Sequence, residues 1–379
     1  MAATIAVTKE TRFGETRIAA TPETVKKLIA LGYAVTVEAG AGLSASIPNA
    51  EFEAAGASLA KTAEQALANA DIVLKVRGPS AAEIAGLKSG AIVIALMNAY
   101  NDPDMLAAMA AKGVTGFAME FVPRITRAQV MDALSSQANL AGYRAVIEGA
   151  EAYGRVLPMM MTAAGTVAAA KVFIMGVGVA GLQAIATARR LGAVVTATDV
   201  RPATKEQVES LGAKFLAVED DEFKNAQTAG GYAKEMSADY QAKQAALVST
   251  HIAKQDIVIT TALIPGRPAP KLVSAEQVAS MKPGSILVDL AIEQGGNVVG
   301  AELDKTVVTA NGAKILGLSN LPGRIATDAS ALYARNLFAF VGLLGLNDGA
   351  VKPDLEDEIL KAAVLTHAGA IVHPAFKLQ

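Results

Sequence analysis

The sequence predicts an α/β fold with two domains, each built on a parallel sheet flanked by helices. The chain has 379 residues, which is too long for one typical hydrophobic core. Short apolar runs alternate with helical segments in two series, separated by a long helical stretch within 124–156. A glycine-rich turn directly follows the first apolar run of the second series. Together these observations predict two Rossmann-like domains linked by long helices.

The first series predicts buried parallel strands at 4–7, 34–40, 71–76, 91–97 and 115–121. The segments between them carry helix start signals. The hydroxyl of Thr21 can cap a helix that begins at Pro22, since proline is favoured at the first helical position. Thr62 and Gln65 have the spacing of a capping box, which predicts a second helix start.

The second series is expected after a loop and long helix at 124–156 and a connecting segment at 157–170. Its strands are expected at 171–176, 193–199, 214–218, 256–262, 285–291 and 313–322. After Pro322 the pattern becomes helical over 327–346, and this helix is expected to return to the first domain. The predicted domains are therefore 1–135 with 325–379, which is discontinuous, and 136–324.

Composition excludes several classes of function. The net charge is −2, so neither nucleic acid nor an anionic membrane is an expected partner. The absence of cysteine excludes a disulfide framework and thiolate metal sites, and it fits a reducing compartment. No spacing of histidines and carboxylates predicts a metal site. The best apolar stretch, 172–186, is interrupted by glycines and Gln183 and is shorter than the roughly 20 residues of a membrane span.

The glycine-rich turn predicts a dinucleotide site. Gly176, Gly178 and Gly181 form G-x-G-x-x-G between an apolar strand and a helix. The first glycine permits the tight turn, the second lets the backbone approach a pyrophosphate, and the third brings helix and strand together. The helix N-terminus then favours the phosphates. The alternative is that these glycines serve only a closely packed turn.

The choice of dinucleotide depends on Asp199, which ends the second strand of this series. A carboxylate there accepts hydrogen bonds from the adenine ribose and repels a 2′-phosphate. At a few ångströms, that repulsion is on the order of a few kcal/mol. Arg201 leaves the choice partly open, because an arginine can neutralise the phosphate. We favour NAD(H) over NADP(H).

The sequence offers no obvious acid–base catalyst. Dehydrogenases that oxidise alcohols or amines move a proton as well as a hydride and need a general base. The three histidines, His251, His367 and His373, all lie far from the glycine turn along the chain, and we expect structural roles for them.

The N-terminal "TKETRFGETRIAATPETVKKLIALGYAVTVEAGAG" and "DIVLKVRGP" resemble alanine dehydrogenase and the NAD-binding component of proton-translocating transhydrogenase, which share one two-domain plan. Alanine dehydrogenases hold the keto acid with an arginine and a lysine, aided by a histidine and an aspartate. The matching residues are Arg17, Arg77, Asn98 and Glu293. Three of the four identities differ, which argues against alanine turnover.

The middle of the chain, above all "RAQVMDALSSQANLAGYRA", resembles transhydrogenase specifically. The resemblance implies that Arg124, Gln129, Asp132 and Ser135 surround the nicotinamide, and that Tyr232 and Met236 belong to a loop that folds over the nucleotide. The implied cofactor-binding residues are Arg124, Ile125, Thr126, Arg127, Gln129, Asp132, Ser135, Gly176, Gly178, Val179, Gly181, Asp199, Val200, Arg201, Gly231, Tyr232, Gln244 and Leu263.

Hydride transfer between two nicotinamides changes no O–H or N–H bond, so such a site needs no general base. It must supply proximity, ring orientation and exclusion of water. The resemblance further implies NADP(H) on a partner subunit, membrane-spanning partner subunits, a homodimer, and a location on the cytoplasmic face of the inner membrane. Two other functions stay open: a stand-alone alanine dehydrogenase-like oxidoreductase, and a non-catalytic NAD-binding module.

Overall fold

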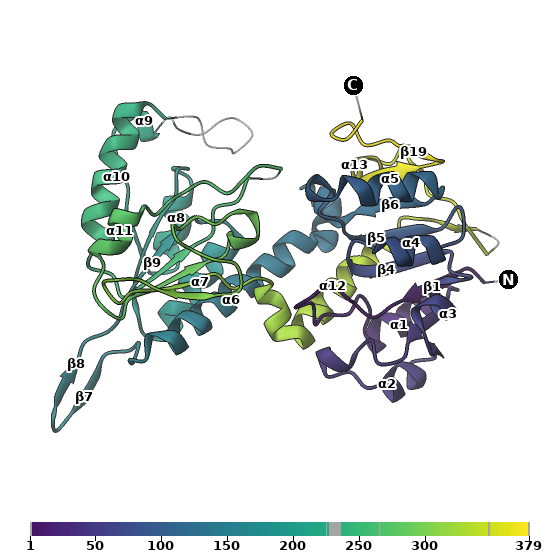
Figure 1. Ribbon diagram of the computed structural model, residues 1–379, viewed down its shortest axis with the longest axis horizontal. Coiled ribbons are helices and arrows are strands. Elements are labelled where there is room, and N and C mark those ends of the chain that lie inside the picture. The colour runs from purple at the N-terminus through teal and green to yellow at the C-terminus, as the bar shows by residue number, and fades with distance from the viewer. Residues whose placement is uncertain (1, 225, 227–235, 265, 348, 378–379) are drawn as a thin grey trace. The chain divides into compact units, whose positions relative to one another are not determined.

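The chain folds into two compact units, shown in Figure 1 as a computed structural model that describes residues 2–224, 226, 236–264, 266–347 and 349–377. Unit 1 comprises Met1–Gln137 and Pro322–Gln379, and unit 2 comprises Ala138–Leu321. The chain passes from unit 1 to unit 2 inside helix α6 (Ala133–Tyr153). It returns inside the short 3-10 helix η6 (Leu321–Ile325).

Unit 1 contains an eight-stranded sheet in the order β19-β18-β6-β5-β4-β1-β2-β3. Strands β1 to β6 are parallel, whereas β18 pairs antiparallel with both β6 and β19. The strands are β1 (Thr4–Val7), β2 (Ala34–Glu38), β3 (Ser58–Ala60), β4 (Ile72–Arg77), β5 (Ile92–Leu96), β6 (Thr115–Ala118), β18 (Val364–His367) and β19 (Ala370–Ile371), with a separate hairpin of β16 (Leu346–Asn347) and β17 (Ala350–Val351).

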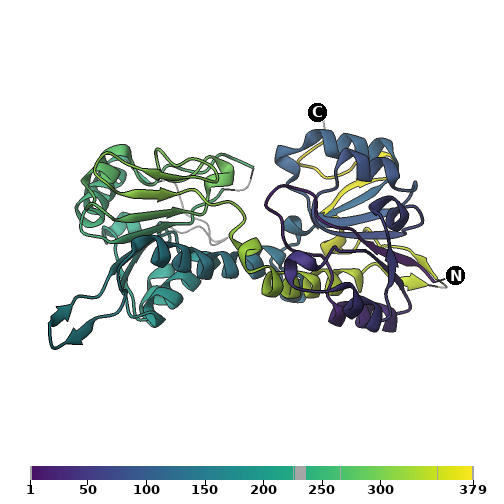
Figure 2. The same cartoon turned by 60° about the horizontal axis from the view of Figure 1, so that its bottom comes forward.

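Helices cover both faces of this sheet (Figure 2). Side chains of β4 alternate between two apolar cores: Leu74 packs with α1 and α12, and Val73 with α4 and α5. The helices of unit 1 are α1 (Pro22–Ala30), α2 (Asn49–Ala54), α3 (Ala63–Leu67), α4 (Ala81–Gly86), α5 (Pro103–Ala111), the start of α6, α12 (Ala326–Val341) and α13 (Glu358–Ala363). The predicted helix starts are confirmed, because Thr21 and Thr62 are N-caps.

Unit 2 contains a seven-stranded sheet in the order β11-β10-β9-β12-β13-β15-β14, parallel except for β14. The strands are β9 (Lys171–Met175), β10 (Val194–Thr198), β11 (Lys214–Phe215), β12 (Ile257–Thr260), β13 (Ile286–Asp289), β14 (Thr306–Val308) and β15 (Lys314–Leu316), with a separate hairpin of β7 (Met160–Thr162) and β8 (Gly165–Val167). The helices are the remainder of α6, α7 (Val179–Arg190), α8 (Thr204–Ser210), α9 (Asp221–Lys224), α10 (Ala238–Ile252) and α11 (Ala275–Ser280).

The structure differs from the sequence expectation at the sheet edges. The strand expected at 214–218 is only Lys214–Phe215. Neither sheet is wholly parallel, because β14 and β18 are antiparallel strands that were not expected. The connecting segment at 157–170 contains a β-hairpin that extends away from the sheet of unit 2 (Figure 2). Within the described residues, no helix combines the length and apolarity needed to cross a bilayer.

Candidate functional site

Among the parallel strands of each sheet, the strand order reverses at one point. It lies between β1 and β4 in unit 1, and between β9 and β12 in unit 2. Open α/β sheets bind ligands beyond the carboxyl ends of the strands at this point. The two points are therefore candidate sites, and they differ in the side chains that surround them.

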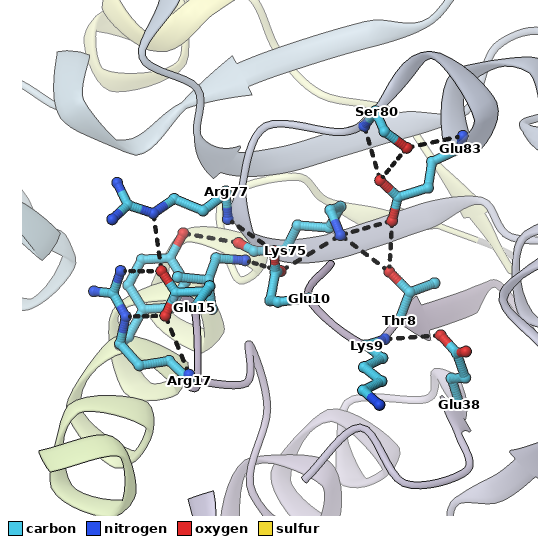
Figure 3. Close-up of polar contacts among 12 residues, drawn as sticks. Thr8, Lys9, Glu10, Glu15, Arg17, Glu38, Lys75, Arg77, Ser80 and Glu83 are labelled. Atoms are coloured by element: carbon cyan, nitrogen blue, oxygen red, sulfur yellow. Dashed lines mark hydrogen bonds and ion pairs between the residues drawn. The ribbon is translucent and has the colours of Figure 1, made fainter. Parts of the chain in front are cut away.

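In unit 1, paired charges of the chain itself fill the reversal point (Figure 3). Lys75 of β4 is buried, and its Nζ lies 2.7 Å from Glu83 Oε1, 3.5 Å from Glu10 Oε1 and 3.2 Å from Thr8 Oγ1. The carboxylate of Glu10 also accepts a hydrogen bond from the backbone N–H of Val76. Burial raises the pKa of Glu10, although the charge of Lys75 opposes this. Because these groups satisfy one another, they leave little hydrogen-bonding capacity for a ligand.

The neighbouring arginines are likewise neutralised (Figure 3). Both nitrogens Nε and Nη2 of Arg17 lie 2.7 Å from the carboxylate of Glu15, and Arg77 Nε lies 2.9 Å from the same group. Burial favours protonation of Glu15, but the two arginines outweigh it and hold the pKa at about 2. The carboxylate of Glu15 therefore pairs with both Arg17 and Arg77, which the sequence resemblance matches to the keto-acid-binding residues of alanine dehydrogenases.

Asn98 and Glu293, the other two residues that the resemblance matches to the keto-acid site of alanine dehydrogenases, also have structural contacts. The backbone N–H of Asn98 donates to Glu120 Oε1 at 2.6 Å. Glu293, in unit 2, accepts a hydrogen bond from the backbone N–H of Asn320. The side chain of Asn98 accepts a hydrogen bond from Asn101 Nδ2 at 3.0 Å, and an amide cannot act as a general base.

In unit 2, the glycine-rich turn lies between β9 and α7, at the reversal point. A Cβ on Gly176, which has φ +103°, would lie 2.5 Å from Thr261 Oγ1, and one on Gly181 would overlap the carbonyl oxygen of Gly176. A Cβ on Gly178 would meet no atom of the described part of the chain within 4 Å, and the φ of −83° at this position suits any residue. The fold therefore requires the first and third glycines but not the second. No side chain caps this end of α7 among the described residues.

Asp199 and Gln244 organise the end of β10 beside this turn. Asp199 Oδ2 accepts the backbone N–H of Val177 at 2.7 Å, which fixes the glycine turn. Arg201 Nε and Nη2 each lie 2.9 Å from the Asp199 carboxylate. Gln244 Nε2 donates to Thr198 Oγ1, and its Oε1 accepts the N–H of Val218.

Apolar side chains remain exposed around the same edge. Val179, Val200 and Leu263 follow β9, β10 and β12, and they are 38, 54 and 49% exposed. Exposed apolar side chains at the carboxyl ends of adjacent strands suit the faces of a base or a nicotinamide ring. The positions Gly231 and Tyr232, assigned to the site from the sequence, lie outside the described residues.

The loop that precedes α6 presents a second set of predicted residues, all in unit 1. Asp132 caps the helix, because its Oδ1 accepts the N–H of Ser135 at 2.8 Å and its Oδ2 accepts the Ser135 hydroxyl at 2.6 Å. Arg124 and Gln129 are exposed, and within the described chain their side chains have no partner. Arg127 instead pairs with Asp357 at 2.7 Å. Ile125 packs against the core, and Thr126 is exposed.

Two buried asparagines hold these loops, and sequence reasoning missed both. Asn336 of α12 donates to the carbonyl of Val130 at 2.8 Å and accepts the Ser136 hydroxyl at 2.7 Å. Asn297 accepts the N–H of Ala262 at 3.0 Å and donates to the carbonyls of Ala262 and Pro270, each at 2.8 Å. For Asn336, an amide before the apolar run 337–341 was the available signal, whereas Asn297 follows Gln294 and two glycines and carries no such signal.

The histidines have structural contacts, as expected. His251 Nε2 lies 2.8 Å from Thr196 Oγ1, and burial lowers its pKa. His367 Nδ1 lies 3.1 Å from Thr115 Oγ1. His373 packs against the ring of Phe121. In the described portion of the chain, no cluster of three or more histidines and carboxylates is arranged to hold a metal ion.

Comparison with known proteins finds family matches over both parts of the chain. Residues 6–141 match the family model "Alanine dehydrogenase/PNT, N-terminal domain" and residues 145–374 match "Alanine dehydrogenase/PNT, C-terminal domain". The chain is 54% identical to the first part of NAD(P) transhydrogenase subunit alpha of Rhodospirillum rubrum, over 99% of both chains. The crystal structure of transhydrogenase from Sinorhizobium meliloti is 58% identical, with a TM-score of 0.89, over 97% of this chain and all of that one. The alanine dehydrogenase of Bacillus subtilis is 31% identical over 98% of this chain and 93% of its own.

Proposed function

The chain belongs to the alanine dehydrogenase/PNT family, as the first part of a transhydrogenase alpha subunit, and we propose that it binds NAD(H) at the glycine turn of unit 2. The observation that carries this proposal is Gly178, whose missing side chain serves no contact among the described residues. A pyrophosphate approaching the backbone there would account for it. We further propose that the chain has two functional domains, residues 1–135 with 325–379 and residues 136–324.

We propose that two sets of residues hold the dinucleotide. In unit 2, the N-terminus of α7 would receive the pyrophosphate, Asp199 the adenine ribose, and the exposed apolar side chains the ring faces. In unit 1, the exposed side chains of Arg124 and Gln129 and the paired Asp132 and Ser135 would orient the nicotinamide. The full proposed set is Arg124, Ile125, Thr126, Gln129, Asp132, Ser135, Gly176, Gly178, Val179, Gly181, Asp199, Val200, Arg201, Gln244 and Leu263, with Gly231 and Tyr232 outside the described residues. Arg127 fits less well, because it is paired with Asp357.

Bound NADH would supply a hydride to NADP⁺ held by a partner subunit. Polar side chains that do not titrate near neutrality suit this task, since the transfer requires orientation and exclusion of water rather than proton movement. Partner subunits follow from membership among transhydrogenase subunits. We propose that these partners bind NADP(H) and span the membrane, and that the chain resides at the cytoplasmic face of the inner membrane through them.

We also propose that the chain forms a homodimer. The β7–β8 hairpin supports this, because Met159, Met161 and Val167 are 63, 77 and 39% exposed. Contiguous exposed apolar residues are typical of protein–protein contacts.

Reconstitution tests the proposed function. The purified chain is mixed with an NADP-binding transhydrogenase subunit, and reduction of an NAD analogue by NADPH is followed spectroscopically. We expect turnover only in the mixture. NADH binding without turnover in the mixture would instead favour a non-catalytic NAD-binding module.

The alternative of a stand-alone alanine dehydrogenase has its own test. Arg17 and Arg77 already pair with the carboxylate of Glu15, which leaves them less able to bind the carboxylate of a substrate. We therefore expect no oxidation of alanine by the chain with NAD⁺. Alanine-dependent NADH formation by the chain alone would contradict the proposed function.

A further inference from the structure

The carboxylate of Asp199 is saturated by donors of the chain. Oδ2 accepts the N–H of Val177 at 2.7 Å and Nη2 of Arg201 at 2.9 Å. Oδ1 accepts the N–H and Nε of Arg201, each at 2.9 Å. An ionised carboxylate offers about four acceptor positions. Since the Asp199 side chain is only 7% exposed, a further donor must replace one that is already bound.

The four donors fall into two pairs. Two are backbone N–H groups, which fix the glycine turn and the residues after β10. The other two belong to one guanidinium, whose Nη2 also donates to the carbonyl of Val177 at 3.1 Å. A vicinal ribose diol likewise presents two adjacent donors. The guanidinium therefore occupies the two acceptor positions that a ribose would need.

We propose that Arg201 is a specificity-determining residue: its guanidinium occupies Asp199 until the ribose diol of NAD(H) replaces it. This inference rests on the proposed binding of NAD(H) in unit 2. The 2′-phosphate of NADP(H) brings acceptors rather than donors, so it cannot replace the guanidinium on a carboxylate. Asp199 thus acts twice against NADP(H), by repelling the phosphate and by holding the nearby arginine away from it.

Lys205 provides a matched control. It lies four residues after Arg201, and its Nζ lies 2.8 and 2.6 Å from the two carboxylate oxygens of Glu219. Its replacement by alanine removes the same charge from the same segment without touching Asp199.

The first test measures NADH and NADPH binding to the full chain by isothermal titration calorimetry. We expect Arg201→Ala to bind NADH about two- to fivefold more tightly, because the competitor is gone. Lys205→Ala should bind NADH as the original chain does. Weaker or unchanged binding of NADH to Arg201→Ala would overturn the proposal, since Arg201 would then not compete with the nucleotide.

The second test releases the arginine. We expect Asp199→Ser to bind NADPH at least about tenfold more tightly than the original chain, because Arg201 becomes available to the 2′-phosphate. That gain should disappear in Asp199→Ser combined with Arg201→Ala. A gain that survives in the double variant, or no gain at all, would overturn the proposal. Asp199→Asn, which keeps an acceptor for Val177, provides the same comparison if the serine variant is unstable.

The outcomes separate this inference from the proposed function. A failure of the original chain to bind NADH would contradict the proposed function itself. The original chain could instead bind NADH normally while Arg201→Ala fails to bind NADH more tightly, or while Asp199→Ser fails to gain NADPH binding that depends on Arg201. Either result would contradict only the competition between Arg201 and the ribose.

Discussion

Glu15 shows how one buried residue determines the chemistry of its surroundings. Its pKa is held at about 2, below the usual 4.5, by the two arginines despite burial. A lowered carboxyl pKa stabilises the fold above the unfolded-state pKa, and this stabilisation is lost as the pH falls from about 4.5 towards 2. The shift corresponds to roughly 3 kcal/mol. Glu15→Gln should lower the free energy of unfolding of unit 1 by about that amount at pH 7.

The free energy of unfolding is measured by urea unfolding between pH 3 and 7. Glu23 provides the control for this prediction. Its pKa is also about 2, because Arg335 and Lys27 donate to it, but its side chain is 42% exposed. Water and salt screen exposed pairs, so Glu23→Gln should cost less than about 1 kcal/mol. Equal losses in the two variants would contradict the role of burial.

Gln129 tests the proposed orientation of the nicotinamide. Its side chain is exposed and lacks a partner within the described residues, so its replacement removes no contact of the fold. Gln129→Ala should lower hydride transfer in the reconstituted mixture by about tenfold or more, because misorientation of reacting groups is costly. The Kd for NADH should change less than about twofold. Gln207→Ala, at an exposed position on α8, should change neither quantity. Parallel losses of binding and transfer would count against the orienting role.

At the scale of elements, Asn297 fixes the segment after β12 that carries Leu263. Removing its amide leaves the polar groups of Ala262 and Pro270 without their buried partner. We expect Asn297→Ala to destabilise unit 2 by about 3 kcal/mol and to weaken NADH binding. Asn311→Ala is the matched control, since Asn311 holds the carbonyls of Val278 and Met281 in a different loop. It should lose stability but bind NADH normally; a similar loss of NADH binding in both variants would mean that Asn297 acts only through stability.

Local sequence signals predicted elements whose causes are local. Thr21 and Thr62 cap helices as expected, because capping depends on residues within one turn. The glycine turn was predictable for the same reason, because its three glycines lie within six residues of one another. Strand β18 was missed because it follows α13 without a break, and because its place in the sheet depends on long-range pairing with β6 as well as on the short hairpin with β19. The pairing of Arg77 with Glu15 also joins parts of the chain that are far apart in sequence, so spacing along the chain could not predict it.

At the scale of the whole molecule, two units of the same architecture differ in how their reversal points are filled. Unit 1 places Lys75, Glu10 and Glu83 there, whereas unit 2 places a glycine turn in which no atom of the described residues would contact a Cβ on Gly178. Buried ion pairs resist the removal of one partner, because the remaining charge would be left without compensation. The charges of unit 1 thus fill the edge of its own sheet, which is consistent with the proposal that the dinucleotide binds at the glycine turn of unit 2.

The β7–β8 hairpin carries the last prediction, which concerns the proposed homodimer. Met161 is 77% exposed in the middle of β7, whose three residues are all exposed, an unfavourable arrangement for a chain that stays monomeric in water. Met161→Glu should shift the chain from dimer to monomer in sedimentation equilibrium, because association would bury the new charge. Val308→Glu, at a 65% exposed position on β14, is the control and should leave the dimer intact. A dimer that survives Met161→Glu unchanged would mean that this hairpin does not form the contact between copies.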